Sequence, residues 1–210
     1  AASPEWLRGI ARIAKKHGAL LIVDDIQAGI GRTGGFFSFD GLGIEPDLIP
    51  LAKSLSGFGL PFAALLIRRE LDIWGPAEHN GTFRGNTHAF VTGRVALEKF
   101  WADDRFEREV AEKAAYLEKR LGDMAGLLPD ATLKGRGMMR GIDVGSGELA
   151  GRICEACFRE GLIIETSGAH DEVVKVLAPL TIPQEQFAAG LDILERAVRA
   201  EAGSLRMAAE

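Results

Sequence analysis

Apolar and polar residues follow one another along the chain in blocks that predict helices separated by short strands. Ser3 and Pro4 precede apolar residues at helical spacing, which is typical of a helix with a serine cap and a proline in its first turn. We expect this helix to end near Gly18. The apolar run at residues 19–23 is typical of a strand covered on both faces of a parallel sheet. Two further runs beside glycine or proline predict short strands, at residues 47–49 and 63–67.

The pattern changes over residues 89–121, where apolar positions predict a long helix or a pair of helices that connects two lobes. After a loop at residues 128–130, strands and helices mix as they do in an α+β unit. The strands and the final helix of this unit are expected at residues 138–144, 162–164 and 173–177, and from Pro183 onward. The sequence therefore predicts three parts: an α/β unit at residues 1–88, connecting helices at 89–127 and a small α+β domain at 128–210.

Composition narrows the class of protein. The chain has 210 residues, of which 47% are hydrophobic, so it can bury a sizeable core. Its formal net charge is −5 and no basic stripe is present, so nucleic acid is not expected as a partner. We see no apolar segment long enough to cross a bilayer and no signal-like start, and we therefore expect a cytoplasmic protein with no membrane partner.

The two cysteines, Cys154 and Cys157, form a C-x-x-C motif that could indicate a metal or redox site. They lie within a helical pattern, and the sequence offers no second pair of ligands to complete a zinc site. We therefore predict reduced thiols near a packed helix face, and no metal.

The residues with the clearest candidate chemistry are Asp24 and Lys53. Each follows an apolar run, and ligands of open α/β sheets collect beyond the carboxyl ends of strands, so an acid and an amine could reach one crevice. Pyridoxal phosphate requires this pair: a carboxylate that keeps its ring nitrogen protonated and a lysine that binds it covalently. Gln27 could donate to the phenolic oxygen of the cofactor. The alternative is an aspartate that caps a turn and a lysine on the solvated surface.

Residues 24–34 (DDIQAGIGRTG), Pro46-Asp47 and Ala52-Lys53 together resemble the signature of class III pyridoxal-phosphate-dependent aminotransferases of fold type I. The resemblance runs nearly end to end. It implies an α/β fold, in which this chain supplies the C-terminal part of the enzyme. Residues 1–88 would then be part of the cofactor-binding large domain with its mostly parallel sheet, followed by the small α+β lobe.

The resemblance also implies a role for four residues. Asp24 would pair with the pyridine nitrogen, Gln27 would contact the phenolic oxygen, and Lys53 would bind the cofactor covalently. Thr82 matches a threonine that reaches the cofactor phosphate of the neighbouring subunit, which implies a homodimer or a higher homo-oligomer. Without the resemblance, Thr82 is an ordinary turn residue.

Within this family, the segments 54–61, 78–86 and 177–182 most resemble the members that make diaminobutyrate for ectoine biosynthesis. The implied reaction moves an amino group from glutamate to aspartate 4-semialdehyde and gives 2,4-diaminobutyrate and 2-oxoglutarate, so the partners are a small-molecule donor and acceptor. Alternatives are an ornithine-type or other ω-aminotransferase, an amino-aldehyde isomerase, or a non-catalytic interaction domain.

The chain departs from the family pattern in two respects. Lys175 stands where many members have an arginine that binds a substrate carboxylate, and a lysine offers a point charge in place of a bidentate fork. A lysine stem at a strand edge is an equal alternative for this residue. The chain also opens on the helix before the aspartate strand, without the family's phosphate-binding turn and stacking aromatic ring. We therefore expect the isolated chain to bind the cofactor poorly.

Overall fold

The computed structural model describes residues 2–57, 59–82 and 84–209, which form two compact units. The first unit comprises Ala2–Arg108, and the second begins at Glu109. The division falls within one helix, α3 (Arg105–Ala125). The three-part division made from the sequence, with boundaries near residues 88 and 127, remains a prediction.

The first unit begins with α1 (Pro4–Lys16), the helix predicted from the Ser3-Pro4 start. Ser3 caps it, because its hydroxyl oxygen accepts a hydrogen bond of 3.2 Å from the backbone N–H of Trp6. The helix is amphipathic, yet none of its residues is buried. Its apolar side is thus only partly covered within the described part of this unit.

Three extended segments form the centre of the first unit. Strands β1 (Leu48–Leu51) and β2 (Ala64–Ile67) pair antiparallel. Residues 19–25 run beside β1 in the parallel direction, but only a single bridge, between Ile22 and Leu48, joins them as a sheet. The strand predicted at residues 19–23 is therefore no regular strand. A side chain interrupts its ladder, because the N–H of Leu21 donates to the carboxylate of Asp47 at 2.8 Å.

The turn after β1 packs against the helix α2 (Thr87–Phe100). This turn is a short 3₁₀ helix, η1 (Lys53–Ser56), and a second one, η2 (Arg69–Leu71), follows β2. Gly93 of α2 permits the close approach, since a Cβ there would lie 3.1 Å from the carbonyl oxygen of Leu55. Beneath η1, Ile30, Leu51 and Leu55 form a buried apolar cluster.

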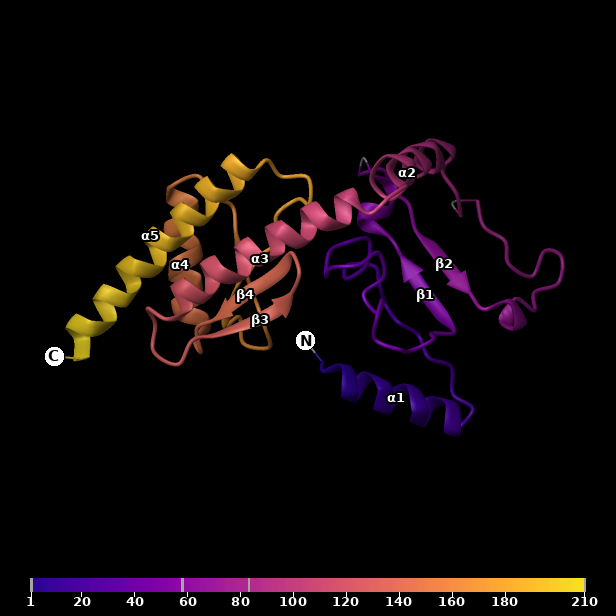
Figure 1. The fold of residues 1–210 in the computed structure, drawn as a ribbon, viewed down its shortest axis with the longest axis horizontal. Coiled ribbons are helices and arrows are strands. Elements are labelled where there is room, and N and C mark those ends of the chain that lie inside the picture. Colours follow the sequence, from indigo (N-terminus) through magenta and orange to yellow (C-terminus); the bar gives the residue numbers. More distant parts are fainter. Residues whose placement is uncertain (1, 58, 83, 210) are drawn as a thin grey trace. The chain divides into compact units, whose positions relative to one another are not determined.

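The second unit is an antiparallel sheet packed with helices, as predicted for an α+β domain (Figure 1). Its strand order is β3-β4-β6-β5. The strands are β3 (Thr132–Arg136), β4 (Met139–Asp143), β5 (Glu165–Ser167) and β6 (Val173–Val176). Two helices complete it with α3, namely α4 (Gly147–Arg159) and α5 (Gln184–Ala209). Fully buried apolar side chains from all three helices and from the sheet form its core, including Leu117, Ile142, Ile153, Val174 and Leu194.

The strand predicted at residues 162–164 was wrong by three positions, because β5 begins at Glu165. The apolar run ends a helix instead. Gly161 has a positive φ of 86°, and the N–H of Leu162 donates to the carbonyl oxygen of Cys157 at 2.9 Å. A glycine in the left-handed conformation followed by an apolar residue is the usual end of an α-helix.

Among the described residues, no helix combines the length and the apolar character that crossing a membrane requires.

Candidate functional site

Asp24 lies exposed at the end of the extended segment 19–25. The N–H of Ile26 donates to its Oδ1 at 3.0 Å, which orients the carboxylate. The next residue, Asp25, has no exposed surface at all. Neighbouring residues of an extended chain point to opposite sides, so the burial of one side chain directs the other outward.

Lys53 is exposed and begins η1, two residues after the end of β1. Its φ is 52°, a left-handed value that is unfavourable for a residue with a Cβ. The surrounding turn maintains this conformation through a hydrogen bond of 3.1 Å from the N–H of Leu55 to the carbonyl oxygen of Ala52. Backbone strain of this kind is concentrated at functional sites, so it supports a functional role for this lysine.

The parallel pairing of residues 21–25 with β1 relates the position of Asp24 to that of Lys53 along the strands. The N–H of Val23 donates to the carbonyl oxygen of Leu48 at 3.0 Å, and that of Asp25 donates to Pro50 at 3.1 Å. Asp24 is thus level with the middle of β1, and at about 3.3 Å per residue Lys53 follows roughly 10 Å further along. Both lie toward the carboxyl ends of parallel segments, where α/β sheets bind ligands.

Gln27 lies in the glycine-rich segment that returns from Asp24 toward β1, and its side chain is partly buried. Hydrogen bonds within the segment determine its shape: the N–H of Gly31 donates to Gly35 at 3.2 Å, and the hydroxyl of Thr33 donates to Ala28 at 2.8 Å. Burial lowers the pKa of the Arg32 guanidinium in the same segment. The structure thus places Gln27 on a defined turn next to Asp24.

Thr82 is exposed on the long loop between β2 and α2 (Figure 1). Two contacts join described residues of this loop: the rings of Trp74 and His79 stack at 5.5 Å, and Arg84 donates to the carbonyl oxygen of His79 at 2.6 Å. Asn86 ends the loop by capping α2, because its side-chain oxygen accepts from the N–H of His88 at 3.0 Å. Thr82 is therefore presented at the surface of the first unit.

Lys175 belongs to the second unit, on β6. Its ammonium lies 2.7 Å from the carboxylate of Glu165, its directly paired neighbour on β5. This ion pair lowers the pKa of Glu165. Lys175 also lines an apolar cavity of about 410 Å³ between the β5–β6 edge and α5. The described structure therefore gives Lys175 a structural partner and leaves its predicted contact with a substrate as a prediction.

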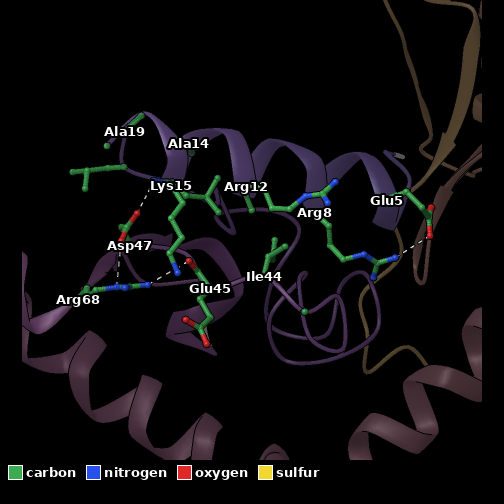
Figure 2. Close-up of a pocket in the computed structure, with 15 residues that line it drawn as sticks. Glu5, Arg8, Arg12, Ala14, Lys15, Ala19, Ile44, Glu45, Asp47 and Arg68 are labelled. Atoms are coloured by element: carbon green, nitrogen blue, oxygen red, sulfur yellow. Dashed lines mark hydrogen bonds and ion pairs between the residues drawn. The ribbon is translucent and has the colours of Figure 1, made fainter.

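A cavity of about 980 Å³ lies between α1 and the segment before β1, and none of the predicted site residues lines it (Figure 2). Arg8, Arg12, Lys15 and Arg68 approach it together with Glu5, Glu45 and Asp47. Charges of both signs line it, and some are already paired: Arg68 lies 3.2 Å from Asp47. We assign the candidate site to the Asp24 edge because the matched acid and amine lie there.

Two aspartates of the family-like segments, to which sequence reasoning gave no role, hold the site together. Asp47 accepts from Leu21 and pairs with Arg68, and so links three extended segments. Asp25 is buried and accepts a hydrogen bond of 2.8 Å from the N–H of Ser38. Each of the two is an acidic residue next to an apolar run, and this position was the sequence feature that could have pointed to its role.

Comparison with known proteins defines the family. The family described as aminotransferase class-III matches residues 1–198, so the chain belongs to the class III aminotransferases. It is 54% identical over 199 residues to the diaminobutyrate–2-oxoglutarate transaminase of Halomonas elongata, and 51% identical over 200 residues to that of Vibrio parahaemolyticus. These matches cover 93% and 94% of this chain but 47% and 48% of the relatives. The chain thus spans about half the length of the curated relatives that it matches.

The fold agrees with this assignment. The solved N-acetylornithine aminotransferase of Stenotrophomonas maltophilia has a TM-score of 0.81 and 30% identity, covering 97% of this chain and 53% of that one. The chain therefore has the α/β architecture of part of an aminotransferase, as the resemblance implied.

The structure bears on the two cysteines of α4 as well. Cys157 is buried, and Cys154 is partly buried. Burial, with smaller contributions from Cys154 and Glu160, raises the pKa of the Cys157 thiol to about 11, and burial also raises that of Cys154. In the described part of the chain, no three His, Cys, Asp or Glu side chains are grouped as metal ligands.

These pKa shifts predict unreactive thiols. The thiolate is the nucleophile, so a pKa raised from 9.0 to about 11 leaves roughly a hundredfold less thiolate at pH 8. Alkylation of Cys157 by iodoacetamide at pH 8 should therefore be at least that much slower in the folded chain than in urea. Peptide mass spectrometry over time measures both rates, and equal rates would contradict the burial of Cys157.

Proposed function

We propose that this chain carries the lysine and the ring-pairing acid of a pyridoxal-phosphate site, and that the complete protein is a transaminase. The observation that carries the proposal is the parallel pairing of residues 21–25 with β1, which brings the exposed Asp24 and Lys53 to one edge. Membership in the class III aminotransferases supports it.

The side chains of Asp24, Gln27 and Lys53 have the chemical groups that pyridoxal phosphate requires. When bound, pyridoxal phosphate supplies an electron sink for the carbon that loses a proton. The carboxylate of Asp24, oriented by the N–H of Ile26, would hold the proton on the ring nitrogen. Gln27 would donate its amide to the phenolic oxygen, and Lys53 would bind the aldehyde carbon through Nζ. Once released by the substrate amine, Nζ of Lys53 would take the substrate proton and return it to a neighbouring carbon.

For the substrates, we propose glutamate as the amino donor and aspartate 4-semialdehyde as the acceptor, with 2,4-diaminobutyrate and 2-oxoglutarate as products. The names of relatives at 54% and 51% identity support this assignment. It would place the enzyme in ectoine biosynthesis, in the cytoplasm. Lys175 would contact a substrate carboxylate, in which case substrate and Glu165 would compete for one ammonium.

The second candidate is an ornithine-type transaminase. It is favoured by the structural likeness to N-acetylornithine aminotransferase, although the identity of 30% is well below that of the diaminobutyrate relatives. The acceptor preference of the complete protein separates the two candidates. If the protein has no catalytic role, it will transfer an amino group to neither acceptor.

The direct test is an assay of the longest natural polypeptide that contains this sequence. With glutamate and aspartate 4-semialdehyde we expect release of 2-oxoglutarate, and a lower kcat/KM when the acceptor is the δ-aldehyde that corresponds to N-acetylornithine. Lys53→Ala should lower kcat by roughly 10²–10⁴-fold, because it removes the group that moves the proton. Lys16→Ala, an exposed lysine of α1, is the matched control and should change kcat little.

Two results would contradict the proposal. If Lys53→Ala keeps the wild-type kcat, Lys53 does not do the chemistry. If the δ-aldehyde that corresponds to N-acetylornithine gives the higher kcat/KM as acceptor, the diaminobutyrate assignment is wrong while the transaminase assignment stands.

We further propose that the protein works as a homodimer in which Thr82 binds the cofactor phosphate of the partner subunit. The exposure of Thr82 is compatible with a contact across an interface. A hydroxyl donor to a charged phosphate oxygen contributes about 1.5–3 kcal/mol.

Hybrid dimers test this contact. Thr82→Ala should weaken cofactor binding roughly 10- to 100-fold, whereas Thr87→Ala at the start of α2 should not. In hybrids of Lys53→Ala and Thr82→Ala subunits, a contact in trans leaves one intact site per dimer, so tight cofactor binding at half occupancy is expected. Hybrids with no tight site would show that Thr82 acts within its own subunit.

A further inference from the structure

The proposed site requires one carboxylate, but two adjacent aspartates, Asp24 and Asp25, lie at this position. The two side chains differ in their exposure to solvent. Asp24 is exposed and Asp25 is fully buried. Because successive residues of an extended segment face opposite sides, a rotation of this segment would exchange the two side chains. Something in the fold must therefore determine which carboxylate faces the site.

The buried environment of Asp25 supplies this constraint. Its Oδ2 accepts a hydrogen bond of 2.8 Å from the N–H of Ser38, its N–H donates to Pro50 on β1, and its carbonyl oxygen accepts from Gly29 at 3.2 Å. Asp25 thus connects β1 to both ends of the glycine-rich segment that carries Gln27.

Gly29 makes room for this carboxylate. A Cβ on Gly29 would lie 2.9 Å from both the Cβ and the Oδ2 of Asp25, closer than real Cβ contacts come. Gly29 is not among the residues with positive φ, so its backbone conformation does not itself require glycine. Glycine is required at position 29 because any side chain there would occupy the space of the Asp25 carboxylate.

The other oxygen of Asp25 indicates that stability alone does not explain the residue. Oδ1 is buried and has no hydrogen-bond partner among the described residues. A buried carboxylate oxygen without a donor destabilises the folded state. Local features that oppose stability are expected mainly at functional sites.

We propose that Asp25 is a positioning residue: its buried carboxylate determines which of the two aspartates faces the cofactor site and holds Asp24 there. The proposal rests on the proposed function for what Asp24 does, but the structural coupling between the two residues can be tested without cofactor. The N–H of Ile26 donates to the Asp24 carboxylate, so the amide proton of Ile26 can be used to follow the protonation of Asp24.

The test follows the amide proton of Ile26 by NMR during a pH titration of the 210-residue chain. In the wild type this proton should shift as the Asp24 carboxylate gains its proton. Asp25→Ala should remove at least half of the shift and speed hydrogen exchange at Ser38 by roughly tenfold or more, because the Ser38 N–H loses its acceptor. Asp25→Asn keeps an oxygen acceptor and should retain most of the shift.

Asp40 provides the matched control. Its carboxylate accepts a hydrogen bond of 2.8 Å from Phe37, next to Ser38 in the same loop, but it is exposed and far from Asp24 in sequence. Asp40→Ala should speed exchange at Phe37 and leave the Ile26 titration unchanged. If Asp40→Ala suppresses that titration as strongly as Asp25→Ala does, Asp25 has only a general structural role and the proposal fails.

Gly29→Ala keeps the proposal testable if Asp25→Ala does not fold. It should suppress the Ile26 titration with Asp25 still present, because its Cβ displaces the carboxylate. An unchanged Ile26 titration in Gly29→Ala, with exchange at Ser38 accelerated because the Asp25 carboxylate is displaced, would overturn the positioning role.

A second readout links the proposal to the cofactor. In the longest natural polypeptide, Asp25→Ala should raise the Kd for pyridoxal phosphate by roughly tenfold, and Asp24→Asn should raise it at least as much. Cofactor binding that survives Asp24→Asn but not Asp25→Asn would reverse the two roles and overturn the proposal. A wild-type protein that binds no cofactor would refute the proposed function, whereas the Ile26 titration would still decide on Asp25.

Discussion

The parallel pairing between residues 21–25 and β1 is the constraint on which the candidate site depends. Two backbone hydrogen bonds, from Val23 to Leu48 and from Asp25 to Pro50, fix the register between segments that are distant in sequence. A shift of one residue would turn the exposed Asp24 inward and bring Asp25 to the surface. The side chain of Asp47 reinforces this register from the start of β1 by accepting from Leu21.

The turns that follow these two segments share one apolar cluster. Ile30 comes from the glycine-rich segment, and Leu51 and Leu55 flank Lys53. Their packing therefore joins the segment that follows Asp24 to the turn that carries Lys53. The left-handed conformation of Lys53 is maintained by the same surroundings. Burial beneath the site thus stabilises a strained residue at its surface, which explains how an exposed lysine can have a defined place.

Sequence reasoning identified the features that local chemistry determines. The Ser3 cap and the final helix after Pro183 appear as predicted, and the long helix or helix pair expected over residues 89–121 is a pair of helices, α2 and α3. The strand expected at residues 162–164 was misplaced, because Leu162 completes the cap of α4 after the left-handed Gly161. The strand β5 is defined by its pairing with β6, a contact that the local sequence does not reveal. Asp24, Gln27 and Lys53 could be selected from their spacing and family resemblance. The burial of Asp25 could not, because it depends on Gly29 and Ser38 approaching in space.

The central claim is that Lys53, which follows the strand paired with the Asp24 segment, is the residue that binds the cofactor. The most direct measurement incubates the longest natural polypeptide with pyridoxal phosphate, reduces it with borohydride and locates the attached pyridoxyl group by peptide mass spectrometry. The account predicts stoichiometric labelling of Lys53 that falls sharply in Asp24→Ala, since the ring then loses its charged partner. Labelling spread over surface lysines such as Lys16 and Lys99, with Lys53 unmodified, would contradict it.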